Sequence, residues 1–163
     1  MHKFLFVHIP KAAGTSIMLA LSAIKGNNKS LLAKTKHETL EEFRNNFGKR
    51  FNLEEDFQPE ILDEYFTFGF VRNPWDRMHS FYRYLLERRP RKEIDGISNF
   101  KDFLVSADNG VDWIQGLHSM RPQLDFIKNS KRGISLDFLG HYEYLLEDFK
   151  DVVSQLNLED SVS

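Results

Sequence analysis

The sequence predicts an α/β fold in three layers, α/β/α, in which helices cover both faces of a mainly parallel central sheet. Apolar runs of strand length at residues 4–9, 66–71 and 134–139 alternate with segments whose apolar residues recur at helical spacing. Polar residues directly follow the first two runs, and open α/β sheets bind ligands at the carboxyl ends of their strands. We therefore expect a single domain over residues 1–163, with its site at that edge.

Length and charge limit the class of protein. A chain of 163 residues with 41% hydrophobic content is large enough for one α/β core, and a formal net charge of −2 argues against nucleic-acid binding. There are no cysteines, which excludes disulfides and cysteine-ligated metals. No apolar run reaches membrane-spanning length and none resembles a signal peptide, so we expect a cytoplasmic protein.

The first apolar run leads into a turn and a helix start that together suit an anion. Pro10 ends the strand, and a helix is expected over residues 17–24, capped by Thr15 or Ser16. Backbone N–H groups, a positive dipole end, two hydroxyls and a lysine then meet where a phosphate or sulfate can bind. The nucleotide P-loop pattern GxxxxGK[ST] is absent. The candidate binding residues here are Lys11, Ala12, Ala13, Gly14, Thr15 and Ser16.

The strand at residues 66–71 ends in a second anion-binding pattern. Asn73-Pro74 is a turn entering a helix, with proline at the first helical position. Arg72 stands at the end of the strand, and Ser80 lies two turns into the helix, facing the same crevice. A guanidinium bonds two oxygens of a phosphate with charge assistance, although a salt bridge to an aspartate, Asp76 or Asp63, is the alternative for Arg72.

Helical spacing marks further core positions. The helix after Pro74 has an apolar stripe, and shorter helices are expected over residues 61–65 and 97–107. A capping box predicts another helix from Thr39 to Phe47. A weak strand at residues 30–35 and a closing amphipathic helix complete the pattern. The positions expected in the core are Leu40, Phe43, Phe47, Trp75, Met78, Phe81, Tyr82, Leu85, Phe100, Phe103, Leu104, Leu145, Phe149, Val152 and Leu156.

Two stretches carry a family resemblance that covers most of the chain. HIPKAAGTS, residues 8–16, resembles the 5′-phosphosulfate loop of sulfotransferases that use 3′-phosphoadenosine 5′-phosphosulfate (PAPS), particularly the carbohydrate-modifying group. RNPWDRMHSFY, residues 72–82, is similar to the RNPxxRxxSxY pattern of their 3′-phosphate site. This sequence departs from the family by an alanine for the usual threonine at Ala12 and a histidine for arginine at His141. It also ends soon after Leu158, whereas family members continue, so either the chain is truncated relative to the family or the cofactor pocket is less covered.

The resemblance implies roles for the candidate residues. Lys11, with Gly14, Thr15 and Ser16, holds the phosphosulfate and stabilises charge on the leaving oxygen. The resemblance also implies that Arg72 and Ser80 bind the 3′-phosphate. His37, at the expected start of a helix, is the candidate general base, whereas a surface histidine is the alternative reading. PAPS is then the donor and 3′-phosphoadenosine 5′-phosphate (PAP) the product, no metal takes part, and a hydroxyl of a carbohydrate is the acceptor. The fold is then P-loop-NTPase-like, and a chain lacking an N-terminal anchor resembles bacterial or viral members.

Two other functions stay open on the sequence alone. One is an atypical P-loop kinase or hydrolase using ATP, and the other is an inactive module that binds PAP or a glycan. Several residues also have two readings. Arg77 suits a salt bridge or a helix-supporting role as well as a ligand contact, and His118 and Gln123 suit packing and hydrogen bonding better than acceptor contact. The basic residues form either a solvated helix end or a patch for an acidic glycan: Arg88, Arg89, Arg91 and Lys92.

Overall fold

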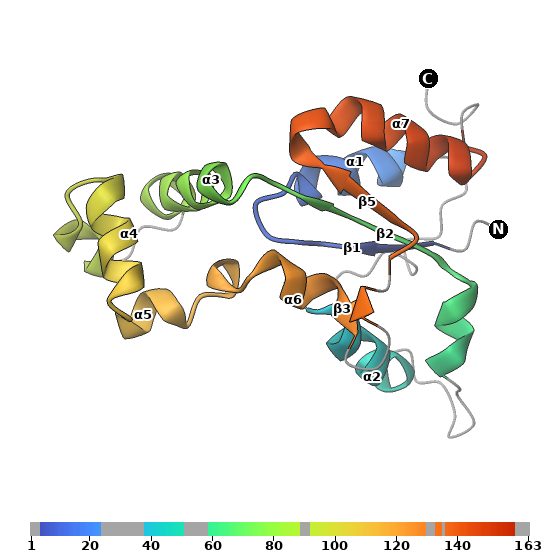
Figure 1. Cartoon of the computed structure of the whole chain (residues 1–163), viewed down its shortest axis with the longest axis horizontal. Helices are drawn as coiled ribbons and strands as arrows, with labels where there is room; N and C mark the ends of the chain where they lie inside the picture. Colours follow the sequence, from blue (N-terminus) through green and yellow to red (C-terminus); the bar gives the residue numbers. More distant parts are fainter. Residues whose placement is uncertain are drawn as a thin grey trace.

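The computed structural model describes residues 4–23, 38–50, 59–88, 92–129, 133–134 and 136–158. Its central sheet has three parallel strands, β1 (Phe4–Val7), β2 (Phe66–Val71) and β5 (Phe138–His141), in the order β1-β2-β5 (Figure 1). The expected strand at residues 30–35 and the candidate base His37 lie outside the described residues.

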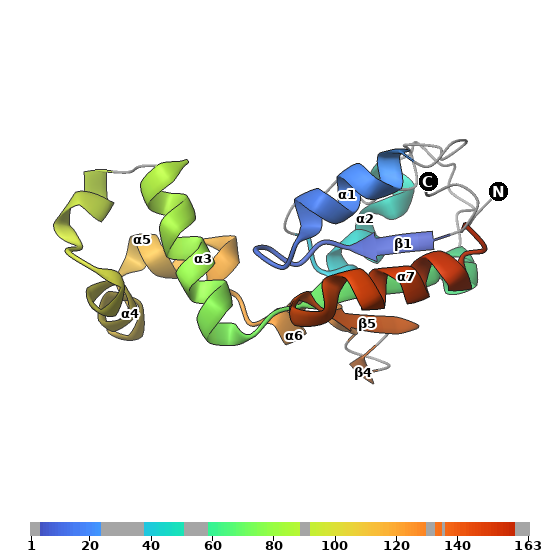
Figure 2. The same cartoon turned by 90° about the horizontal axis from the view of Figure 1, so that it is seen from above.

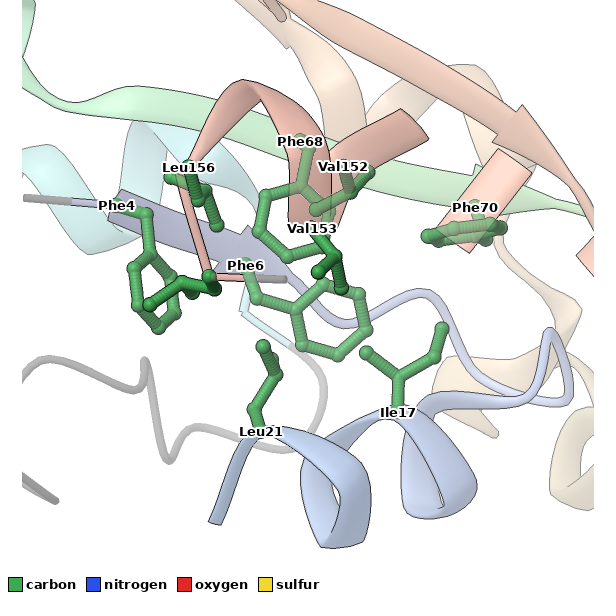
Figure 3. Packing of buried hydrophobic residues seen from close by; sticks show 10 residues of the cluster. Phe4, Phe6, Ile17, Leu21, Phe68, Phe70, Val152, Val153 and Leu156 are labelled. Atoms are coloured by element: carbon green, nitrogen blue, oxygen red, sulfur yellow. The ribbon is translucent and has the colours of Figure 1, made fainter. Parts of the chain in front are cut away.

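Helices cover both faces of this sheet, which confirms the three-layer α/β/α prediction. Helices α1 (Gly14–Ala23) and α7 (Leu145–Gln155) lie on one face, and α2 (Leu40–Arg50), η2 (Pro59–Glu64) and α6 (Gln123–Ile127) lie on the other (Figure 1). Alternate residues of each strand point to opposite faces. Phe4 and Phe6 of β1 therefore pack with α1 and α7 (Figure 3), whereas Leu5 and Val7 pack with α2 and α6.

A helical extension lies beyond the carboxyl ends of the strands (Figure 2). It contains α3 (Pro74–Glu87), η3 (Lys92–Gly96), α4 (Phe100–Asp108), α5 (Asp112–Gln115) and η4 (His118–Met120). These elements share their own core cluster: Phe81, Tyr82, Leu85, Ile94, Phe103, Ala107 and Ile114. Because α3 follows β2 directly, this extension forms a wall beside the edge of the sheet where a ligand is expected.

Side-chain caps confirm two of the predicted helix starts. The Asn73 side chain accepts a hydrogen bond from the backbone N–H of Trp75 at 3.0 Å, and Pro74 is the first residue of α3. Thr39 and Glu42 form the expected capping box, with reciprocal bonds of 2.8 and 3.1 Å. None of the helices in the described ranges combines the length and the apolar character needed to cross a membrane.

Three local predictions are wrong. Helix α1 begins at Gly14, so Thr15 and Ser16 lie inside its first turn and do not cap it. Trp75 is 68% exposed, because the core of the extension contacts α3 only from its second turn onward. The apolar run at residues 134–139 is not one strand.

Instead, Ile134 belongs to β4 (Gly133–Ile134), which pairs antiparallel with β3 (Lys128–Asn129). Asp137 separates this ribbon from β5. Its backbone N–H donates to the Thr67 carbonyl at 2.7 Å, and its carboxylate accepts the Thr67 N–H at 2.6 Å. These two bonds begin the pairing with β2 at Asp137, so β5 starts only after this residue. The apolar run is therefore divided in two.

Candidate functional site

A cavity of about 570 Å³ lies where β1, β2 and β5 end, between the start of α1 and the helical extension. Its volume is in the range of small-molecule sites. The two motifs are far apart in the sequence, and the fold brings them to this one cavity. The lining includes these predicted residues: Lys11, Ala13, Gly14, Thr15, Ser16, Arg72 and Ser80. Ala12 does not line the cavity, since its side chain is buried in the core on the α2 face.

The turn between β1 and α1 has an unusual backbone. Lys11 and Ala13 have φ values of 67° and 62°, the left-handed region that residues other than glycine rarely adopt. A hydrogen bond from Ala12 N–H to Ile9 O, 3.4 Å long, and the burial of Ala12 help to hold this conformation. Such backbone strain occurs at binding sites when the surrounding structure supports it.

Gly14 is required by a close approach of His8. A β-carbon at position 14 would lie 2.0 Å from the His8 ring, which is stacked on Phe6 with a centroid distance of 6.0 Å. The first N–H groups of a helix have no partner within the helix and carry the positive end of its dipole. The start of α1 therefore faces the cavity with the partial charge that an anion needs. His8 itself also lines the cavity.

Lys11 extends into the cavity towards α3. Its ammonium nitrogen lies 4.3 Å from the centroid of the Tyr84 ring, a cation–π contact. Burial lowers the pKa of Lys11, the charge of Arg72 lowers it further, and Glu87 acts in the opposite direction. Two cations whose charges interact thus line the same cavity, an arrangement that a bound anion would stabilise.

The backbone of Arg72 is held by the side chain of Gln123, and Arg72 lines the cavity. Gln123 accepts from the Arg72 N–H at 2.9 Å and donates to its carbonyl at 2.8 Å, which confirms the hydrogen-bonding role predicted for Gln123. The guanidinium lies 3.9 Å over the Tyr142 ring, and one Nη donates to the Lys11 carbonyl at a long 3.4 Å. Asp63 pairs with Arg44 instead. The buried Nε of Arg72 has no hydrogen-bond partner in the described part of the chain.

Sequence reasoning missed two aromatic residues at the site. Tyr84 lies four residues after Ser80, so it shares a face of α3 with that serine, and this spacing would have found it. Tyr142, in η5 (Tyr142–Tyr144), follows the third parallel strand, so the same edge rule that selects Arg72 also selects it. His118 lines the far wall, and Glu143 accepts from the Asn73 N–H at 2.7 Å. In the described ranges, no cluster of His, Asp and Glu is arranged to hold a metal ion.

Comparisons with known proteins agree with this geometry. A family model described as the sulfotransferase family matches residues 1–163. An uncharacterized protein from Archaeoglobus fulgidus is 30% identical over 119 residues, which cover 73% of this chain and 82% of that protein. No solved structure matches the chain. Because the family model spans the whole chain, and the cavity joins both of the motifs that the sequence suggested, the chain belongs to the sulfotransferase family.

Proposed function

We propose that the protein transfers a sulfuryl group from PAPS to a hydroxyl of an acceptor, and that this acceptor is a carbohydrate. One observation carries the proposal: the turn after β1 and the carboxyl end of β2 open into the same cavity of about 570 Å³. A donor with an anionic group at each end needs two cationic anchors on one cavity. Lys11 and Arg72, 61 residues apart in sequence, supply them.

The residues of the cavity fit such a donor. Lys11 and the start of α1, with the hydroxyls of Thr15 and Ser16, hold the 5′-phosphosulfate. Arg72 and Ser80 hold the 3′-phosphate. The buried Nε of Arg72 supports this assignment, because an N–H donor without an acceptor is costly and a phosphate oxygen would satisfy it. PAPS, when bound, supplies a sulfuryl group that passes from a phosphate oxygen to the acceptor oxygen, while the acceptor proton leaves to a base.

The protein's part in this chemistry is positioning and electrostatics. Lys11 stabilises the negative charge that grows on the leaving phosphate oxygen, in a cavity that is partly shielded from water. His37 is the candidate base for the acceptor proton. A positioned general base contributes roughly 10²- to 10⁴-fold to a rate. The likeness of residues 8–16 to the loop of carbohydrate-modifying enzymes supports the acceptor class.

Calorimetric titration with PAP, run beside ATP plus Mg²⁺, tests the donor site without knowledge of the acceptor. We expect PAP to bind and ATP to bind far more weakly. Lys11→Met should weaken PAP by about 1.5–3 kcal/mol through loss of a charged hydrogen bond. The control Lys101→Met, exposed on α4, should leave the affinity unchanged. Preference for ATP plus Mg²⁺ would instead indicate a kinase or hydrolase.

Transfer of sulfate from PAPS to a panel of carbohydrate acceptors tests the reaction itself. We expect His37→Ala to retain wild-type affinity for PAP and to depress transfer by two or more orders of magnitude, as loss of a general base does. If this variant transferred sulfate at the wild-type rate, another residue would be the general base. Binding of PAP without transfer to any acceptor in the panel would favour an inactive binding module.

A further inference from the structure

Arg77 is a buried guanidinium that the chemistry above does not use. Arg77 is 4% exposed and is the fourth residue of α3, between Arg72 and Ser80 in sequence. Burial alone lowers its pKa to about 10. Within the described residues no carboxylate forms an ion pair with Arg77, and the residue is not among those that line the cavity. Neither a salt bridge nor a ligand contact, two of the readings that the sequence left open, therefore accounts for the burial of Arg77.

Its hydrogen bonds lead to two backbone carbonyls. Nε donates to the carbonyl of Pro10 at 3.0 Å, and one Nη donates to the carbonyl of Arg121 at 3.2 Å. These acceptors are 67 and 44 residues away in sequence. The guanidinium thus connects three segments: the turn after β1, helix α3, and the segment that leads into α6.

The bond to the Pro10 carbonyl lies next to a strained residue of the turn. Pro10 directly precedes Lys11, which has the left-handed φ of 67°. The next carbonyl, that of Lys11, accepts from Arg72. Successive carbonyls of the turn are therefore held by two arginines that lie five positions apart in the second motif. A backbone conformation that is unfavourable in isolation persists only where such contacts fix it.

We propose that Arg77 is a positioning residue: it holds the turn at residues 10–14 in the left-handed conformation that points Lys11 and the start of α1 into the cavity. A planar guanidinium suits this role because its donors diverge in a fixed fork, so that one side chain holds two carbonyls. A lysine at position 77 keeps the charge but does not reproduce that fork. The expected effect of Arg77 on donor affinity rests on the proposed function, whereas its expected effect on the conformation of the turn does not.

Amide hydrogen exchange of the full chain tests the proposal without a ligand. In Arg77→Lys we expect exchange at the hydrogen-bonded amides of Ala12 and Ile17, which donate to the carbonyls of Ile9 and Ala13, to become at least tenfold faster, with β2 and α7 unchanged. The matched control is Arg83→Lys on the exposed face of α3, where the side chain pairs with Glu87, and it should leave the turn as it is in the wild type. Exchange at the amides of Ala12 and Ile17 that stays at the wild-type rate, or that rises equally throughout the sheet, would overturn the proposal.

PAP affinity provides the second readout, and we expect at least a tenfold loss in Arg77→Lys. In Arg77→Ala, millimolar ethylguanidinium should restore both slow exchange in the turn and PAP affinity, because it replaces the missing fork. Failure of this rescue in a folded variant would also count against the proposal. Should the wild type not bind PAP, the donor assignment fails while the exchange measurement still decides the role of Arg77. If Arg77→Ala does not fold, the exchange result for Arg77→Lys decides it.

Discussion

Replacing Arg72 by lysine tests which end of the proposed donor this residue binds, the 3′-phosphate or the 5′ end. The guanidinium carbon of Arg72 lies 3.9 Å from the centroid of the Tyr142 ring, one Nη makes a long bond of 3.4 Å to the Lys11 carbonyl, and Nε has no partner in the described part of the chain. The proposed phosphate would accept from this group. Lysine keeps the positive charge and loses the fork. Losing one charged hydrogen bond of about 1.5–3 kcal/mol corresponds to roughly a 10- to 100-fold weaker Kd for PAP.

The assay is calorimetry with two ligands that differ only in the group Arg72 is assigned to hold. PAP carries the 3′-phosphate, whereas adenosine 5′-monophosphate lacks it. We expect Arg72→Lys to weaken PAP and to change the affinity for adenosine 5′-monophosphate less than threefold. Equal losses for both ligands, or an unchanged Kd for PAP, would refute the assignment of Arg72 to the 3′-phosphate.

Four further variants test the charges and the core. Because burial lowers the pKa of Lys11, PAP affinity should begin to fall with rising pH below the ordinary lysine value of about 10.4, and Lys11→Arg should extend binding to higher pH in the same titration. The backbone bond from Asn73 lowers the pKa of Glu143, so its contribution to stability is present above the ordinary glutamate value of about 4.3 and lost as pH falls below it. Glu143→Gln should therefore lower the Tm at pH 7 and reduce the further fall in Tm between pH 5 and pH 3. A fall in Tm over this pH range equal to that of the wild type would contradict this. Phe81→Ala should cost about 3–5 kcal/mol in urea unfolding, and Trp75→Ala should change stability by only about 0.5 kcal/mol; similar costs for the two would contradict the orientation of α3.

Local sequence patterns predicted most of the fold. Apolar runs followed by Pro10 and by Asn73-Pro74 predicted β2 and the start of α3 correctly, and β1 except that it ends at Val7 rather than Ile9, since strand burial and helix capping depend on neighbouring residues. The same patterns selected Lys11 and Arg72, because parallel strands bring their carboxyl ends to one edge of the sheet. His37 stays a prediction.

The sequence by itself thus determined the α/β class, the main elements and the edge of the sheet at which the cavity lies. Tertiary structure alone decided that Trp75 faces solvent, that Asp137 divides an apolar run, and that Tyr84 lies beside Lys11. It also decided that Arg77 reaches the carbonyl of Pro10 rather than a carboxylate. The reason is physical: a helical or strand period is set by nearest neighbours, whereas burial and hydrogen-bond partners depend on residues far away in the chain.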